Sequence, residues 1–216
     1  MASPDHVLNT PDAWSVEGMP VAPPGRMSED EFVAWCGDEV RAEWVDGEVI
    51  VMSPASADHD DLVGWLLAVL RPFAERHNLG TVRGPELQVR LIPGRRRIPD
   101  VLFVSTGRES ILQANYVEGA PDLAIEIVSP DSQARDWREK YLDYQAAGVR
   151  EYWVIDLASQ RAEFYHLDDG GQYSRLEEVD GAITSQVLTG LRLPLAWLWP
   201  AGRPKVIDAL GKLGLL

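Results

Sequence analysis

Apolar and polar positions follow two different rhythms along this chain. Over residues 58–77 the apolar side chains recur every three or four positions, which is typical of a helix that buries one face. Residues 98–104, 123–128 and 151–156 are short, mainly apolar segments rich in β-branched and aromatic residues, which are typical of buried strands. The pattern therefore predicts an α/β protein in which helices cover a β-sheet.

Two positions modify the predicted helices. Pro72 lies inside the 58–77 pattern, where it removes a backbone donor, so we expect a kink or an early end of the helix there. Ser28 and Glu31 have the spacing of a capping box, in which each side chain accepts from the other residue's backbone amide. A short helix is therefore predicted to begin after Ser28.

Two hairpins are predicted before residue 105. The strands 42–45 and 48–52 flank Asp46-Gly47, a dipeptide that favours a type I′ turn. The strands 86–91 and 98–104 flank a Pro-Gly turn, and the returning strand would carry Asp100 near the middle of the sheet.

The second half predicts a parallel strand pair and then a meander. A helix over 132–147, which Gly148 would end as a left-handed cap, separates two apolar runs and indicates a β-α-β unit with parallel strands. Three further segments are separated by turns rich in Asp and Gly and predict a C-terminal β-meander: 161–167, 173–179 and 183–187.

The domain organisation follows from composition. Residues 1–26 contain five prolines and no apolar periodicity, which predicts a flexible leader. Residues 27–200 suit a single domain, because a chain of 216 residues with 45% hydrophobic content can bury a sizeable core. Residues 201–216 form a C-terminal tail, which we expect to pack on the sheet.

Composition also narrows the cellular setting. The longest apolar stretch, Leu62 to Leu70, is far shorter than the ~20 residues of a membrane-spanning helix. The first residues lack the basic start of a secretion signal, so we expect a cytoplasmic protein with no membrane partner. The single cysteine excludes an internal disulfide, and the four scattered histidines have no zinc spacing.

Charge is the main objection to a nucleic-acid partner. The net charge of −14 argues against a general nucleic-acid coat. However, residues 71–108 hold eight arginines against three acids, and Arg95, Arg96 and Arg97 are consecutive. These three arginines are candidates for DNA contact on a local basic surface next to Asp100. The alternative is a solvated hairpin tip, as for most short charge runs.

Two acids lie in predicted strands, where an ionised carboxylate is costly. Asp100 begins one apolar run and Glu126 interrupts another. Burying a carboxylate costs several kcal/mol unless a cation compensates, and a divalent metal is one such cation. The following helix would bring Lys140 over the same strands. Each residue also has a structural alternative: Asp100 as a turn residue and Lys140 as a solvent-facing helix residue.

Several motifs follow one another in a set order. They are Glu43–Glu48, Met52–Pro54 with His59, Pro99–Asp100, Ala120–Pro130, Arg135–Lys140 and Gly148–Asp156. Together they closely resemble the Uma2 (DUF820-type) family of restriction-endonuclease-like proteins, in the PD-(D/E)XK nuclease superfamily. The resemblance covers residues 27–167 and implies a mixed central sheet flanked by helices.

The resemblance also implies a site. Asp100, Glu126 and the backbone carbonyl of Ile127 would bind Mg²⁺ or Mn²⁺, whose preference for oxygen ligands agrees with this set. The superfamily motif has lysine two positions after Glu126, where this chain has Val128. Lys140 on the following helix would take that catalytic role, a substitution that the family shares.

Two further residues complete the implied site. Glu43 would supply an additional catalytic acid, although Glu48 beside the same turn is the alternative. His59 is a helix-start residue that could instead contact phosphate of the nucleic acid.

Three functions are consistent with these residues. The first is a metal-dependent endonuclease that hydrolyses DNA through a metal-activated water, with a homodimer cutting both strands. The second is a catalytically degenerate binding module that keeps the fold. The third, a hydrolase with a Ser129 or Cys36 nucleophile, is disfavoured because neither residue has a glycine elbow around it.

Overall fold

The computed structural model describes residues 21–37, 40–129, 132 and 135–216. The chain divides into two compact units, Met1–Met52 and Ser53–Leu216, which are considered one at a time. Most of the predicted leader lies outside the described residues. The assignment of residues 27–200 to one domain stays a prediction.

The first unit contains a helix and a hairpin, α1 (Glu29–Cys36), β1 (Ala42–Val45) and β2 (Glu48–Val51). Both halves of the predicted capping box form, because Ser28 N donates to Glu31 Oε2 at 2.7 Å and Glu31 N donates to Ser28 Oγ at 3.3 Å. Asp46 and Gly47 take positive φ values of 48° and 93°, as a type I′ turn requires. The predictions for this segment are confirmed.

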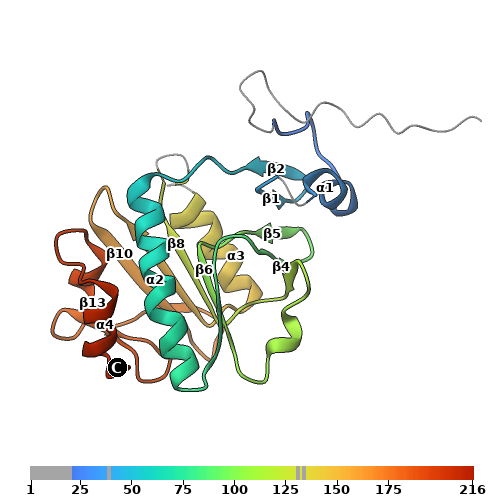
Figure 1. Cartoon of the computed structure of the whole chain (residues 1–216). Coiled ribbons are helices and arrows are strands. Elements are labelled where there is room, and N and C mark those ends of the chain that lie inside the picture. Colours follow the sequence, from blue (N-terminus) through green and yellow to red (C-terminus); the bar gives the residue numbers. More distant parts are fainter. Residues whose placement is uncertain (1–20, 38–39, 130–131, 133–134) are drawn as a thin grey trace, which may run out of the picture. The chain divides into compact units, whose positions relative to one another are not determined.

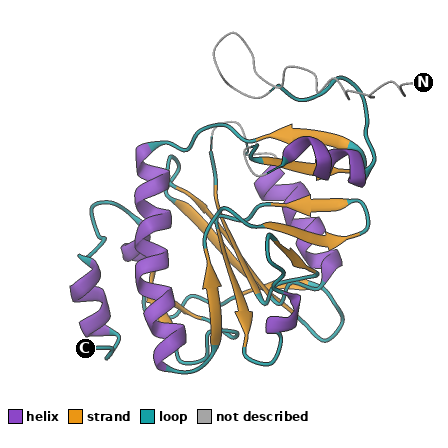
Figure 2. Ribbon diagram, turned by 45° about the vertical axis from the view of Figure 1, so that its right-hand side comes forward, coloured by secondary structure: helices purple, strands orange, loops and turns teal. Residues whose placement is uncertain are grey.

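A mixed six-stranded sheet forms the centre of the second unit (Figure 2). Its strands, in spatial order, are β11 (Tyr173–Arg175), β10 (Arg161–Leu167), β9 (Glu151–Asp156), β8 (Leu123–Ile127), β6 (Val101–Ser105) and β3 (Gly80–Arg83). The β8–β9 pair is parallel and the other pairs are antiparallel. The predicted mixed central sheet is confirmed, and Asp100 directly precedes an interior strand.

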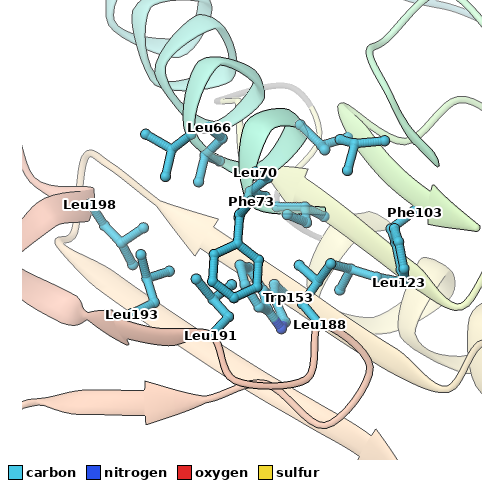
Figure 3. Packing of buried hydrophobic residues seen from close by; sticks show 14 of the residues in the cluster. Leu66, Leu70, Phe73, Phe103, Leu123, Trp153, Leu188, Leu191, Leu193 and Leu198 are labelled. Carbon is cyan, nitrogen blue, oxygen red and sulfur yellow. The ribbon is translucent and has the colours of Figure 1, made fainter. Parts of the chain in front are cut away.

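Helices cover both faces of this sheet (Figure 1), with α2 (Ala57–Arg76) on one face and α3 (Lys140–Ala147) on the other. The strands alternate accordingly, since Ile125 packs with the α2 core whereas Ala124 packs with the α3 core. On the α2 side, Phe73 lies over Trp153 of the sheet (Figure 3). Glu126, next to Ile125, therefore falls on the α3 face.

The β-α-β unit forms as predicted, with one difference at the start of its helix. Gly148 caps α3 at a φ of 85°, and the two flanking strands are parallel. A π-helical turn, η2 (Arg135–Glu139), precedes α3. The helix was predicted to begin near residue 132. Residues 130–131 and 133–134 lie outside the described residues, so this start is not tested.

The second predicted hairpin is wrong. β4 (Gln88–Ile92) pairs with β5 (Arg95–Arg97) and, in parallel, with β7 (Tyr116–Glu118). The chain then leaves this ladder, and β6 pairs with β3 and β8 in the six-stranded sheet. Pro99 lies at this break, and it has no backbone N–H with which to continue a ladder.

The C-terminal meander is confirmed for two of its three strands. β9, β10 and β11 are antiparallel neighbours. The third segment instead forms β12 (Ala182–Thr184), which pairs with β13 (Arg192–Pro194) in a separate two-stranded sheet. Two 3-10 turns, η1 (Glu109–Ile111) and η3 (Leu195–Leu198), complete the connections.

The C-terminal tail packs on helix α2 of the second unit, through a helix that the sequence did not predict, whereas we expected it to pack on the sheet. This helix is α4 (Val206–Lys212). Trp65 of α2 meets Trp197 edge to face at 5.9 Å, and its indole N–H donates to the carbonyl of Pro204 at 2.9 Å.

Pro72 does not end α2, which continues to Arg76. Phe73 and Ala74 after the proline are buried in the core, and their packing offsets the roughly 3 kcal/mol penalty of an interior proline. Within the part of the chain that the structure describes, no helix is long and apolar enough to cross a bilayer.

A buried aspartate holds the segment between β6 and β8. Asp122 accepts a hydrogen bond from Ser105 N at 2.8 Å and lies 2.7 Å from the Arg108 guanidinium. Burial alone raises the pKa of Asp122, but these contacts outweigh burial and hold the pKa below its ordinary value.

We expect Asp122→Asn to lower the free energy of unfolding by about 1–3 kcal/mol at neutral pH, because buried donors lose a charged acceptor. A depressed folded-state pKa stabilises the fold above the unfolded pKa, and this contribution is lost as pH falls through the folded value. Urea denaturation at pH 7 and below pH 4 measures both effects, with Asp169→Asn in an exposed turn as the control. A difference from wild type that is constant with pH would contradict the assignment.

Candidate functional site

Of the two acids that the sequence singled out, Glu126 lies on β8 and Asp100 directly precedes the neighbouring strand β6. Asp100 N donates to Ile125 O at 3.0 Å, and Asp100 Oδ2 accepts from Ile127 N at 2.7 Å. These contacts are to the residues on either side of Glu126. Both carboxylates are buried, with exposed fractions of 4% for Asp100 and 2% for Glu126. The structure thus brings together two acids that are distant in sequence.

His59 lies against Asp100 rather than on a free surface. Its Nε2 atom is 3.1 Å from Asp100 Oδ2. The position is fixed by the start of α2, where the side chain of Ser56 caps the helix and accepts from His59 N at 3.3 Å. The first turn of α2 therefore contributes an imidazole to the acid site.

Helix α3 contacts both oxygens of the other acid. Lys140 Nζ donates to Glu126 Oε2 at 2.8 Å, and the Tyr144 hydroxyl donates to Glu126 Oε1 at 2.6 Å. Residues four apart share one face of a helix, which explains how both reach the same carboxylate. Lys140 is 1% exposed, so the alternative of a solvent-facing helix residue is wrong.

A third buried acid, Asp136, was not predicted as a site residue. Its Oδ1 atom lies 3.2 Å from Lys140 Nζ, and its Oδ2 atom accepts from the Ser132 hydroxyl. The ammonium of Lys140 is therefore held between two carboxylates. The acid-lysine spacing of four positions was visible in the sequence, but a charged helix face in solvent has the same spacing.

A buried tyrosine supports the turn that carries Asp136. The Tyr152 hydroxyl donates to the carbonyl of Asp136 at 2.7 Å. Burial, followed by the nearby charges of Glu126 and Asp136, raises the pKa of Tyr152 well above its ordinary value. Its hydroxyl therefore stays protonated and remains a donor.

Two of the three consecutive arginines face an acid on α3. Arg97 is fully buried, and its Nη2 atom lies 2.6 Å from Asp143 Oδ2. Arg95 Nε donates to the other oxygen of Asp143 at 2.8 Å. Asp143 thus ties β5 to α3, the helix that carries Lys140.

Arg96 has different partners and is also buried, at 8% exposed. Its guanidinium lies 5.2 Å from the centre of the Tyr116 ring. The alternative of a solvated hairpin tip at 95–97 is therefore wrong, since these residues form a strand. The low exposure of Arg96 and Arg97 favours a structural role for these two residues. Contact of the three arginines with DNA stays a prediction.

Glu43 and Glu48 belong to the first unit, so neither is placed relative to Asp100. Glu43 is opposite Ile50 in the β1–β2 hairpin, and Glu48 is opposite Val45. Glu48 is exposed, whereas Glu43 is buried. Participation of either acid in the site stays a prediction.

The donor set on these strands suits a hard divalent cation. Mg²⁺ is commonly held by one or two carboxylates, with waters and substrate phosphates completing the octahedron, and Asp100 and Glu126 supply two. Among the described residues, no group of three or more His, Cys, Asp and Glu side chains forms a ready metal site. The chemistry therefore fits an ion held partly by substrate, and the carbonyl of Ile127 stays a predicted ligand.

Comparison with known proteins places this chain in a family. The profile of the Uma2 family, described as "Putative restriction endonuclease", matches residues 29–196. This chain belongs to the Uma2 family. The match includes Asp100, Glu126 and Lys140.

A solved structure from Anabaena variabilis, described as "a putative nuclease belonging to DUF820", has the same fold. It superposes with a TM-score of 0.66 and 20% sequence identity, over 80% of this chain and 97% of that one. The predicted restriction-endonuclease-like fold is confirmed. The family match and the shared fold together support a nuclease. No curated protein matches the chain.

The lysine-glutamate contact should be measurable as an energetic coupling. Lys140→Met leaves Glu126 buried without its cation and should lower the free energy of unfolding by about 3–5 kcal/mol. Adding Glu126→Gln removes the uncompensated charge, so the double variant should be more stable than the sum of the single effects by about 0.5–3 kcal/mol.

Urea denaturation of both single variants and the double variant tests this coupling. The control is the double variant Lys140→Met with Glu178→Gln. Glu178 is exposed and distant in sequence, so the two changes in the free energy of unfolding should add. Additive effects of Lys140→Met and Glu126→Gln would show that the ion pair contributes nothing.

Proposed function

We propose that this Uma2 protein is a metal-dependent endonuclease that hydrolyses phosphodiester bonds in DNA. The observation that carries the proposal is the convergence of three buried residues: Asp100 just before β6, Glu126 on β8 and Lys140 on α3. Two carboxylates and an ammonium are the groups that such hydrolysis needs. Family membership supports the nuclease class, and the DNA substrate and metal dependence are part of the proposal.

Asp100 and Glu126 are the residues that would hold Mg²⁺ or Mn²⁺. A bound divalent ion lowers the pKa of a coordinated water and offsets charge on the phosphate. Glu126 lies on β8 and Asp100 directly precedes the neighbouring strand β6, where the hydrogen bond from Asp100 N to Ile125 O holds the two backbones together. The backbone carbonyl of Ile127 is the further ligand that we propose.

Lys140 would orient the attacking water and offset negative charge that develops on the phosphate. The superfamily motif position is taken by Val128, which packs in the core on the α3 face. Lys140 reaches that same face from the helix, so a lysine from α3 replaces one from the strand. Its contact with Glu126 at 2.8 Å keeps the ammonium beside the proposed metal ligand.

Substrate contact is proposed for His59, at the start of α2, and for Arg95, the most exposed of the three consecutive arginines. A protein of net charge −14 repels DNA at long range, so the contacts must be local to the site. Cleavage of both strands needs two sites, for which we propose a homodimer.

We expect the purified protein to cut DNA only when Mg²⁺ or Mn²⁺ is added. Asp100→Asn and Glu126→Gln should each lower the rate about 100-fold or more, since losing a metal ligand removes several kcal/mol of stabilisation. Cleavage of supercoiled plasmid, followed on agarose gels with and without EDTA, measures this.

Asp169→Asn and Glu178→Gln make the same chemical changes at exposed positions and should cleave at the wild-type rate. Activity that persists in both site variants, or in EDTA, would refute the assignment.

A second function, a binding module with a degenerate site, is favoured by one observation. Both oxygens of Glu126 already accept hydrogen bonds, from Lys140 and Tyr144. If calorimetry detects Mn²⁺ binding but no cleavage occurs across single-stranded and double-stranded DNA and RNA, this second function is correct.

A further inference from the structure

The hydroxyl of Tyr144 contacts Glu126 and has no role in the proposed catalysis. Its hydroxyl donates to Glu126 Oε1 at 2.6 Å, while Lys140 donates to Oε2 at 2.8 Å. We propose that Tyr144 is a positioning residue that fixes the orientation of the Glu126 carboxylate for a divalent cation. The inference rests on the proposed function and deepens it.

A glutamate carboxylate needs such a contact because its last torsion angle is only weakly restrained. The terminal torsion of glutamate has a broad distribution, so a single hydrogen bond to one oxygen leaves the group able to turn about Cγ–Cδ. A second donor on the other oxygen, from Tyr144, removes this freedom. The carboxylate of Glu126 is thus held at both oxygens by one helix.

The donor of this second hydrogen bond is itself fixed. The Tyr144 side chain is fully buried, and its ring packs on the Tyr152 ring at a centroid distance of 5.1 Å. The backbone of Tyr144 is also tied down, because its carbonyl accepts from Val149 N at 3.0 Å where α3 ends. Because the Tyr144 hydroxyl is fixed in this way, rotation of the Glu126 carboxylate would break the hydrogen bond between them.

The hydrogen bond from Tyr144 to Glu126 is a strong one. A hydrogen bond to an ionised acceptor in a buried site is stronger than a neutral one. Tyr144 therefore aligns Glu126 before the ion arrives, as residues behind a metal ligand commonly do.

A purely structural role predicts a different outcome. If Tyr144 only fills space and satisfies a buried acid, loss of its hydroxyl lowers stability and leaves the metal affinity of the folded protein unchanged. If Tyr144 positions Glu126, the metal affinity falls as well. The two roles are separated by measuring metal binding and unfolding on the same variant.

The test is Tyr144→Phe in the full chain, titrated with Mn²⁺ by isothermal calorimetry in the absence of DNA. We expect the dissociation constant to rise about 10–100-fold, as is usual when a partner of a metal ligand is lost. Tyr173→Phe is the matched control, because that buried hydroxyl donates to the carbonyl of Val149 at 2.8 Å instead of to an acid of the site. It should keep the wild-type affinity.

Urea denaturation of both variants shows whether the fold is intact. If Tyr144→Phe is partly unfolded at 25 °C, all proteins are titrated near 10 °C with sucrose, an osmolyte that favours the folded state. Wild-type Mn²⁺ affinity in folded Tyr144→Phe, or an equal loss in Tyr173→Phe, overturns the inference.

The outcome also separates this inference from the proposed function. Absence of Mn²⁺ binding to the wild-type protein would refute the metal site and the role of Tyr144 together. Wild-type binding that is retained in Tyr144→Phe would refute the role of Tyr144 alone and leave the nuclease proposal standing.

Discussion

The buried carboxylate of Glu126 is the constraint on which the rest of the site depends. A charge that is only 2% exposed in the middle of a sheet strand must be compensated nearby. The compensation comes from α3, which places the Lys140 ammonium and the Tyr144 hydroxyl against Glu126. Asp136 in the preceding turn is a second acid that the same ammonium must neutralise. The β-α-β connection thus brings strand acid and helix cation together.

The two faces of the sheet contribute differently to the site. The α2 face is a mainly apolar core around Trp153, whose indole donates to the buried Glu151, and the first turn of α2 reaches Asp100 through His59. The α3 face combines apolar packing with the buried polar network around Glu126. Because Asp100 directly precedes β6, the site forms where the two layers meet at one end of the interior strands β6 and β8.

The arginines show where local pattern misleads. Arg95–Arg97 follow a Pro-Gly turn and suggested an exposed basic tip, yet Arg97 is buried against Asp143 of α3. A charge run has the same local pattern whether it is solvated or buried, and its partner here is more than 40 residues away in the chain. For the same reason, the pairing of β6 with β3 and β8, instead of with β4, could not be predicted from alternation.

The sequence by itself determined the capped helix after Ser28, the first hairpin, the long helix over 58–77 and the parallel β8–β9 pair, because periodicity and caps are local properties. It also pointed to Asp100 and Glu126, since acids in apolar runs are conspicuous, whereas the role of Lys140 rested on the resemblance to the family. Only the tertiary structure decided which groups surround those three. In the sequence, Tyr144 and Asp136 have the pattern of ordinary helix residues. The packing of α3 on the sheet places Tyr144 against Glu126 and Asp136 against Lys140. A contact between distant segments depends on how layers pack, and no spacing along the chain encodes it.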